Sequence, residues 1–169
     1  ITDYADTASD LAFCREDAEK LAGSFRAAGL MDTSNQTVLV DGECTAGNIR
    51  RAFERLKTRV DDDDIVVFFY SGHGMRTDPG DYPGEVDDRN DTLYLSGDTE
   101  VSDDELAGWL DTLADGALKI VALDACHSGG FARDVVSTRN RVGFFSSEED
   151  VTSAVADEFR AGGYLSLMF

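Results

Sequence analysis

The stretch that decides the fold is Leu118–Gly130, LKIVALDACHSGG. Its first half, residues 118–123, is a short apolar run with branched side chains, which predicts a buried strand. The run stops at Asp124, and small and polar residues follow, among them Cys126. In open α/β sheets the groups that do chemistry lie at the carboxyl ends of strands. The stretch therefore predicts a strand that displays a thiol where it ends.

A second stretch has the same organisation. Residues 64–70, DIVVFFY, form an apolar run, and Ser71-Gly72-His73-Gly74 follows directly. A lone cysteine is most often a small buried hydrophobe. A nearby imidazole changes that interpretation, because it can act as the base that a cysteine nucleophile needs. We predict that His73 faces Cys126 across the ends of two neighbouring strands.

The chain has one other histidine, His127, which adjoins Cys126. Neighbouring side chains on extended backbone point to opposite faces. His127 is therefore the poorer partner for the thiol, and we predict a supporting or structural role for it.

Together the two motifs resemble the caspase-like cysteine peptidases. YSGHG at residues 70–74 precedes DACHSG at residues 124–129, and the separation of about fifty residues is similar to that between the caspase His and Cys. The resemblance is closer to metacaspases and orthocaspases, since caspases have Gln where this chain has Asp124. It covers nearly the whole chain and implies a caspase-like α/β fold, with a mainly parallel central sheet and helices on both faces.

This resemblance implies a cysteine endopeptidase with a Cys126/His73 dyad and an acyl-enzyme intermediate. The tetrahedral oxyanion needs donors that are already in place. The resemblance points to the backbone N–H groups of Gly74 and Cys126, and glycine permits the close approach that such a donor requires.

Specificity is implied by the same family. Metacaspase-like enzymes cut after Arg or Lys, and their acidic pocket matches Asp17, Ser71 and Asp124. A buried pair of carboxylates discriminates strongly in favour of a guanidinium. Two plainer alternatives stay open: Asp17 as a solvated helix residue, and Asp124 as a hydrogen-bond partner of its own loop.

Calcium is a further implication, because many metacaspases need it. Their acidic ligands match Asp88, Asp103 and Asp104, and a hard cation takes several oxygen ligands from separate segments. The family usually has another Asp soon after the Cys, where this chain offers only Asp134, one place displaced. Residues 102–105, SDDE, also have a structural explanation as a capping box that opens a helix. Calcium therefore stays an open alternative, and no organic cofactor is expected.

Three arginines follow the Cys126 motif: Arg133, Arg139 and Arg141. Their segment is polar, and exposed polar segments are where proteolytic nicking concentrates. We predict that the active protein cuts itself after one of them, with Arg139 and Arg141 preferred. The alternative is that these arginines only balance an acidic surface.

Composition sets the class of protein. The 169 residues suffice for one domain with a core, and we predict a single peptidase domain over residues 1–169 that is incomplete at both ends. The net charge of −19 argues against nucleic acid or anionic membrane as a partner. The three cysteines lack paired or metal-like spacing, which favours a reducing compartment. We therefore expect a cytoplasmic protein that acts on proteins or peptides with Arg or Lys before the scissile bond.

Periodicity and turn signals locate the remaining elements. We expect helices over residues 10–28, from Thr45 to about Val60, and after a cap at Ser102. We expect strands at residues 37–40, 92–95 and 142–145, and one long loop at residues 75–91.

Three other interpretations remain. One is a peptidase of the CHAT type with a different specificity. Another is a catalytically silent caspase-like domain for protein interaction, against which the presence of both Cys126 and His73 argues. The third is a doubly wound nucleotide-binding or receiver-type domain, for which the chain has no phosphate-cradling glycine motif.

Overall fold

A parallel sheet forms the centre of the molecule. The computed structural model describes residues 1–77, 80, 89–97 and 99–168. The strand order in the sheet is β1–β5–β6, with the bounds Ile65–Ser71, Leu118–Asp124 and Arg141–Phe145. The middle strand, β5, is buried along most of its length, which explains its nearly continuous apolar sequence.

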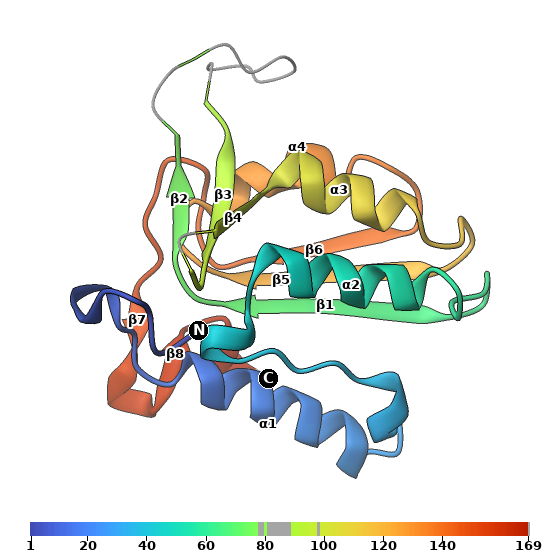
Figure 1. Cartoon of the computed structure of the whole chain (residues 1–169), viewed down its shortest axis with the longest axis horizontal. Helices are drawn as coiled ribbons and strands as arrows, with labels where there is room; N and C mark the ends of the chain where they lie inside the picture. Colours follow the sequence, from blue (N-terminus) through green and yellow to red (C-terminus); the bar gives the residue numbers. More distant parts are fainter. Residues whose placement is uncertain (78–79, 81–88, 98, 169) are drawn as a thin grey trace.

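Helices cover both faces of this sheet (Figure 1). On one side lies α1, Cys14–Ala27. On the other lie α2, α3 and α4, at Ala46–Leu56, Asp103–Asp111 and Ala132–Val135. Phe53 of α2 and Leu106 of α3 pack with β5 residues in one hydrophobic core. The predicted α/β fold with a mainly parallel sheet is confirmed.

Two small antiparallel sheets complete the structure. The first has the order β2–β3–β4, with the bounds Gly74–Arg76, Asp91–Leu95 and Thr99–Ser102. The second pairs β7, Val155–Ala156, with β8, Ala161–Gly163. Short 3-10 helices lie between these elements: η1 Thr7–Ser9, η2 Thr33–Asn35, η3 Asp41–Glu43, η4 Ser128–Phe131, η5 Asp157–Phe159 and η6 Ser166–Met168.

The register of the central sheet decides where the chemistry lies. β1 and β5 run parallel, and Ser71 pairs with Asp124 at their carboxyl ends. His73 is two residues beyond Ser71, and Cys126 is two residues beyond Asp124. Because both strands end at the same edge, the two residues leave the sheet at the same level.

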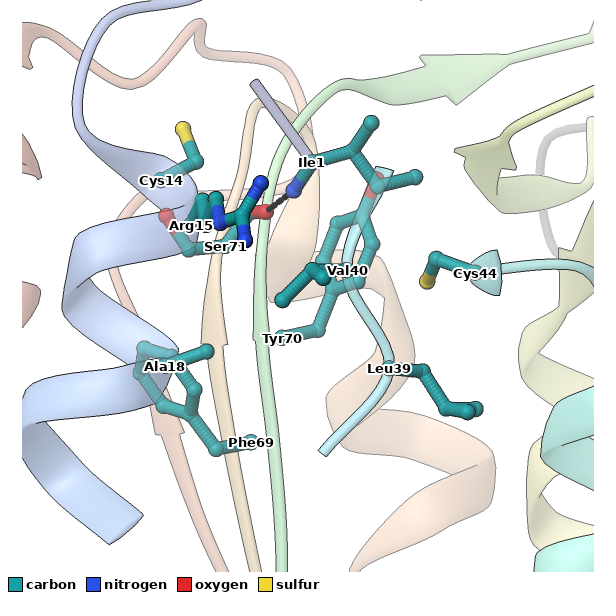
Figure 2. A pocket seen from close by; sticks show the side chains of 10 residues that line it. All are labelled: Ile1, Cys14, Arg15, Ala18, Leu39, Val40, Cys44, Phe69, Tyr70 and Ser71. Carbon is teal, nitrogen blue, oxygen red and sulfur yellow. Dashed lines mark hydrogen bonds between the residues drawn. The ribbon is translucent and has the colours of Figure 1, made fainter. Parts of the chain in front are cut away.

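The strand expected at residues 37–40 is wrong. Gln36 and Val40 have extended backbone angles, but residues 37–40 belong to no ladder among the described strands. A cavity of about 40 Å³ lies between Leu39, Val40 and the end of β1 (Figure 2). An extended segment without a paired neighbour is not a strand, and the apolar sequence alone cannot supply that neighbour.

Other boundaries also shift. The first helix begins at Cys14 rather than at residue 10, because Phe13 adopts a left-handed conformation with φ of 65°. The second helix ends at Leu56 rather than near Val60. The expected loop at 75–91 is shorter, because β2 and β3 take its ends; residues 78–79 and 81–88 lie outside the described part.

The capping box at the start of α3 is confirmed. Ser102 Oγ accepts a hydrogen bond from Glu105 N at 3.1 Å, and Glu105 Oε2 accepts one from Ser102 N at 3.3 Å.

Among the residues that the structure describes, none of the helices combines the length and the hydrophobicity of a membrane-spanning segment.

Candidate active site

The loops that follow β1 and β5 are in direct contact. Gly72 N donates a hydrogen bond to Asp124 O at 3.2 Å. A methyl group added to Gly74 would collide with the backbone carbonyl of Cys126. Glycine is therefore required at position 74, and the loop that carries His73 lies against the loop that carries Cys126.

The imidazole of His73 is oriented by a main-chain carbonyl. Nε2 lies 2.7 Å from Ser9 O, at the end of η1. A carbonyl oxygen can only accept, so Nε2 carries the hydrogen of the neutral ring. Nδ1 is then the ring nitrogen with a free lone pair, which is the state that a general base needs.

Two tyrosines hold the backbone of His73. The Tyr4 hydroxyl accepts a hydrogen bond from His73 N at 2.9 Å, and the Tyr70 hydroxyl donates to His73 O at 2.9 Å. Burial raises the pKa of Tyr4 to about 12 and also raises the pKa of Tyr70. Both phenols therefore stay neutral at physiological pH. No sequence pattern predicts these contacts or the one to Ser9, because an apolar strand pattern does not determine the direction of a hydroxyl or a carbonyl group.

Serines that follow β6 hold the turn of Cys126. Ser146 Oγ accepts from Ala125 N at 3.0 Å, and Ser147 Oγ accepts from Ser128 N at 3.1 Å. The thiol itself is half-buried, 3.9 Å from the carbonyl oxygen of Ser153. The segment that follows β6 thus holds the turn that follows β5.

His127 points to a different partner. Its Nδ1 lies 2.9 Å from Glu149 O, and its backbone, left-handed with φ of 56°, donates to Val151 O at 3.1 Å. These contacts anchor the Cys126 turn to residues 149–151, which favours the structural role expected for this histidine.

The structure brings together the three residues predicted for the acidic pocket. Asp17 comes from the first turn of α1, Ser71 from the end of β1 and Asp124 from the end of β5. Each is only 5% exposed, and Ser71 Oγ donates to Asp17 Oδ2 at 3.4 Å. Burial raises the pKa of Asp17, and the charge of Asp124 adds to the rise. Asp17 is therefore not a solvated helix residue.

Comparison with known proteins decides the family. Residues 1–160 match the family model described as the caspase domain. This chain belongs to the caspase-domain family. The predicted resemblance is confirmed.

The relatives of this caspase domain include plant metacaspases. The chain is 32% identical over 134 residues to Metacaspase-4 from Arabidopsis thaliana, covering 75% of this chain and 32% of that protein. It is 28% identical over 134 residues to Metacaspase-7 from the same plant, covering 75% and 33%. The crystal structure of protein GSU0716 from Geobacter sulfurreducens matches with a TM-score of 0.60 and 32% identity, over 72% of this chain and 43% of that one. The chain spans about a third of the length of these curated relatives.

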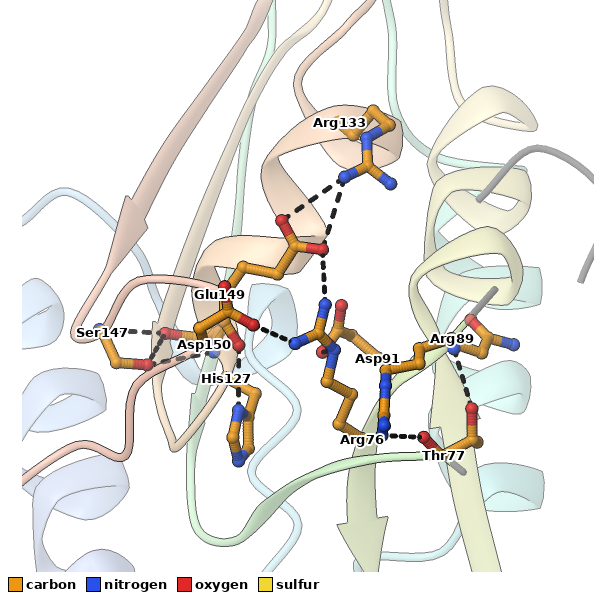
Figure 3. A network of polar contacts seen from close by, with 11 residues as sticks. Arg76, Thr77, Arg89, Asp91, His127, Arg133, Ser147, Glu149 and Asp150 are labelled. Atoms are coloured by element: carbon orange, nitrogen blue, oxygen red, sulfur yellow. Dashed lines mark hydrogen bonds and ion pairs between the residues drawn. The ribbon is translucent and has the colours of Figure 1, made fainter. Parts of the chain in front are cut away.

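An ion-pair network lies beside the turn that follows β5 in this caspase domain (Figure 3). The Glu149 carboxylate lies 2.9 Å from Arg76 of β2 and 3.4 Å from Arg133 of α4. Arg76 also contacts Asp91 of β3, at 3.9 Å, and Asp150. The Glu149 carboxylate thus links β2 to α4, and its backbone carbonyl lies at hydrogen-bond distance from the His127 ring.

Glu149→Gln is expected to lower the free energy of unfolding by about 1–2 kcal/mol. This loss lies between the energies typical of exposed and of buried ion pairs, because the Glu149 side chain is partly exposed and the Arg76 side chain is only 13% exposed. Chemical denaturation measures the change. Glu148→Gln is the matched control, since its side chain is exposed, and equal losses for both variants would contradict the network's role.

Two of the predicted calcium ligands, Asp103 and Asp104, lie in the first turn of α3. Asp103 is buried, Asp104 is exposed, and Asp88 falls outside the described residues. Burial raises the pKa of Asp134, on α4, and the Asp104 charge raises it further. Within the described ranges, no three His, Cys, Asp or Glu side chains converge as a metal site.

The three candidate processing sites differ in accessibility. Arg133 lies in α4 and pairs with Glu149. The Arg141 side chain, at the start of β6, is 2% exposed, pairs with Asp111 and donates to Val135 O at 3.1 Å. The expectation of an exposed segment up to Arg141 is wrong for Arg141, whose side chain is buried at the start of β6, whereas the Arg133 side chain is 35% exposed on α4. Arg139 is exposed in the turn before β6.

Proposed function

We propose that this caspase domain is the catalytic part of a cysteine endopeptidase that cuts after Arg or Lys. The observation that carries the proposal is the register of β1 and β5. It pairs Ser71 with Asp124, so that the two pocket residues and the two dyad residues, His73 and Cys126, leave the same edge of the sheet together.

The proposed reaction begins with proton transfer from the Cys126 thiol to Nδ1 of His73. The thiolate attacks the carbonyl carbon of the scissile bond, and the oxyanion accepts hydrogen bonds from the N–H groups of Gly74 and Cys126. His73 then gives its proton to the leaving amine, which leaves an acyl group on the sulfur. Water, deprotonated by His73, hydrolyses this thioester and restores the thiol.

Ser9 is a positioning residue in this proposal. Its carbonyl accepts from Nε2 of His73, and the same contact stabilises the imidazolium that forms when Nδ1 takes a proton. It has the orienting role that a carboxylate has in other triads.

Substrate preference follows from the charge of the pocket. Asp17 and Asp124 present buried carboxylates at the sheet edge, where a guanidinium forms charge-assisted hydrogen bonds and an aspartate meets like charge. Fluorogenic peptides that differ only in Arg, Lys or Asp before the scissile bond test the proposal. Preference for Asp would overturn the acidic pocket, and no turnover with any peptide would favour the silent interaction domain.

Self-cleavage is expected after Arg139. It is the fully exposed member of the three arginines and lies in a turn, and exposed loop tips are preferred sites of proteolytic nicking. Mass spectrometry of the incubated protein is expected to find a cut between Arg139 and Asn140 that Arg139→Ala removes. Arg133→Ala is the control and should leave the cut in place; an intact segment in the active wild type would disprove self-processing.

We also propose a calcium site with Asp88, Asp103 and Asp104 as ligands, to which Asp134 contributes. The support is that Asp134 Oδ2 is buried without a hydrogen-bond partner, and that burial, followed by the charge of Asp104, raises the Asp134 pKa. A divalent cation would satisfy this oxygen and offset the repulsion.

Asp134→Asn is expected to stabilise the calcium-free protein at neutral pH. A carboxyl whose pKa is raised on folding favours its protonated form in the folded state, so its cost is absent below both pKa values and complete above them. The same variant should lose the rise in Tm that calcium gives the wild type by mass action. Thermal unfolding with calcium or chelator measures both effects, and a wild type unaffected by millimolar calcium would remove the site.

A further inference from the structure

The chain itself covers the acidic pocket. Residues 161–166, from β8 to the start of η6, lie next to the beginning of α1 (Figure 1). Gly162 N donates to Asp17 Oδ2 at 2.7 Å, and Ser166 N donates to Asp124 Oδ2 at 2.6 Å. Each pocket carboxylate therefore already has a backbone donor from this segment.

The approach of the segment depends on two glycines. A methyl group added to Gly162 would lie 2.7 Å from Cys14 Sγ and 2.8 Å from Asp17 Oδ2, and one added to Gly163 would collide with the Asp124 carboxylate. Any other side chain at these positions would enter the pocket. The segment thus fits the carboxylates as bare backbone.

Ala161 is buried and β8 pairs with β7, but few large apolar side chains hold the rest of this segment. Phe159, Tyr164 and Leu167, the large side chains around it, are each about half exposed. Arg160, directly before it, has a left-handed backbone with φ of 58°, and its carbonyl accepts from Lys20 Nζ at 3.1 Å. Segments with few buried apolar contacts open at low free-energy cost, and the two amide–carboxylate bonds attach this one directly to Asp17 and Asp124.

We propose that residues 161–166 are a displaceable cap on the acidic pocket. The amides of Gly162 and Ser166 satisfy Asp17 and Asp124 until a substrate arrives, and the substrate side chain then takes their place. This inference rests on the proposed function and adds the regulation of the same site. If only a fraction of the molecules have the cap open, the apparent affinity for substrate equals the affinity of the open form multiplied by that fraction.

The cap also contributes to selectivity. A guanidinium or an ammonium brings several N–H donors and a positive charge to both carboxylates. A neutral side chain that displaced the amides would leave two buried carboxylates unpaired, which is costly. Only a cationic side chain therefore exchanges well with the cap.

A disulfide that fastens the cap tests the proposal. In Gly162→Cys the new Cβ would lie beside Cys14 Sγ, within the separation that a disulfide spans. Oxidised glutathione takes two electrons and two protons from the thiols as the bond forms. We expect the oxidised variant to lose cleavage of a peptidyl-Arg substrate and to regain it with dithiothreitol, while iodoacetamide still alkylates Cys126.

The double variant Gly162→Cys/Cys14→Ser, treated in parallel, has the same crowding without the disulfide and should respond to oxidant as the wild type does. Equal cleavage by the oxidised and reduced single variant would overturn the cap, and so would failure of the two thiols to pair.

Amide exchange measured by NMR on the wild type needs no variant. Labelling Cys126 with a peptidyl-Arg chloromethyl ketone should speed exchange at Gly162 and Ser166, whereas iodoacetamide should not; unchanged protection would also overturn the cap. If the wild type cleaves no Arg or Lys peptide at all, the proposed function has failed instead.

Discussion

Replacing Cys126 by Ala is expected to abolish peptide cleavage and leave the fold intact. The side chain is half-buried in a turn that Ser146 and Ser147 hold through backbone groups, so loss of the sulfur removes the nucleophile and little packing. Circular dichroism and thermal unfolding check the fold, and a fluorogenic Arg peptide checks the activity. Residual turnover at a substantial fraction of the wild-type rate would exclude Cys126 as the nucleophile.

The two histidines provide the matched comparison. His73→Ala is expected to reduce kcat by about 10²–10⁴-fold, the usual contribution of general acid–base catalysis. His127→Ala should reduce kcat much less, because the His127 ring contacts the carbonyl oxygen of Glu149 and is not part of the proposed dyad. Equal losses in the two folded variants would contradict the choice of His73.

Asp124→Asn is expected to lower kcat/KM for an Arg peptide by roughly 30- to 4,000-fold. Truncating one member of a buried charge pair costs about 2–5 kcal/mol, and each 1.4 kcal/mol is about tenfold. Asp17→Asn should act in the same direction, since both carboxylates are buried side by side with Ser71.

Two controls separate lost recognition from lost chemistry in these variants. Iodoacetamide should still alkylate Cys126 in Asp124→Asn at the wild-type rate. Asp63→Asn removes one negative charge from an exposed turn before β1 and should leave kcat/KM unchanged. If Asp63→Asn lowered kcat/KM as much as Asp124→Asn, the effect would come from net charge and not from a pocket.

The sequence was sufficient for the central sheet and for the position of Cys126 and His73. Each lies just past a short apolar strand, and parallel strands bring such ends together whatever the rest of the chain does. The strand at residues 37–40 could not be judged in this way, because pairing depends on a neighbour that local pattern does not reveal. Arg141 was expected to be exposed, but it belongs to β6 and lies buried beside Asp111.

The remaining parts of the site depend on contacts over long sequence distances. Glu149 meets Arg76 from another sheet, and the amides of Gly162 and Ser166 meet carboxylates from α1 and β5. Backbone donors carry no residue signature, and a charged residue in an acidic chain of net charge −19 does not stand out. Only the folded arrangement identifies them.

The contact between His73 and Ser9 has a consequence for how this site tolerates evolutionary drift. Every amino acid supplies the same carbonyl, so the side chain at position 9 is free to change over generations without disturbing the imidazole. An insertion or deletion of one residue near η1 would instead move that oxygen away from Nε2. Descendants of this chain should therefore vary in the type of residue at position 9. They should keep the number of residues between Asp6, the N-cap residue of η1, and the start of α1.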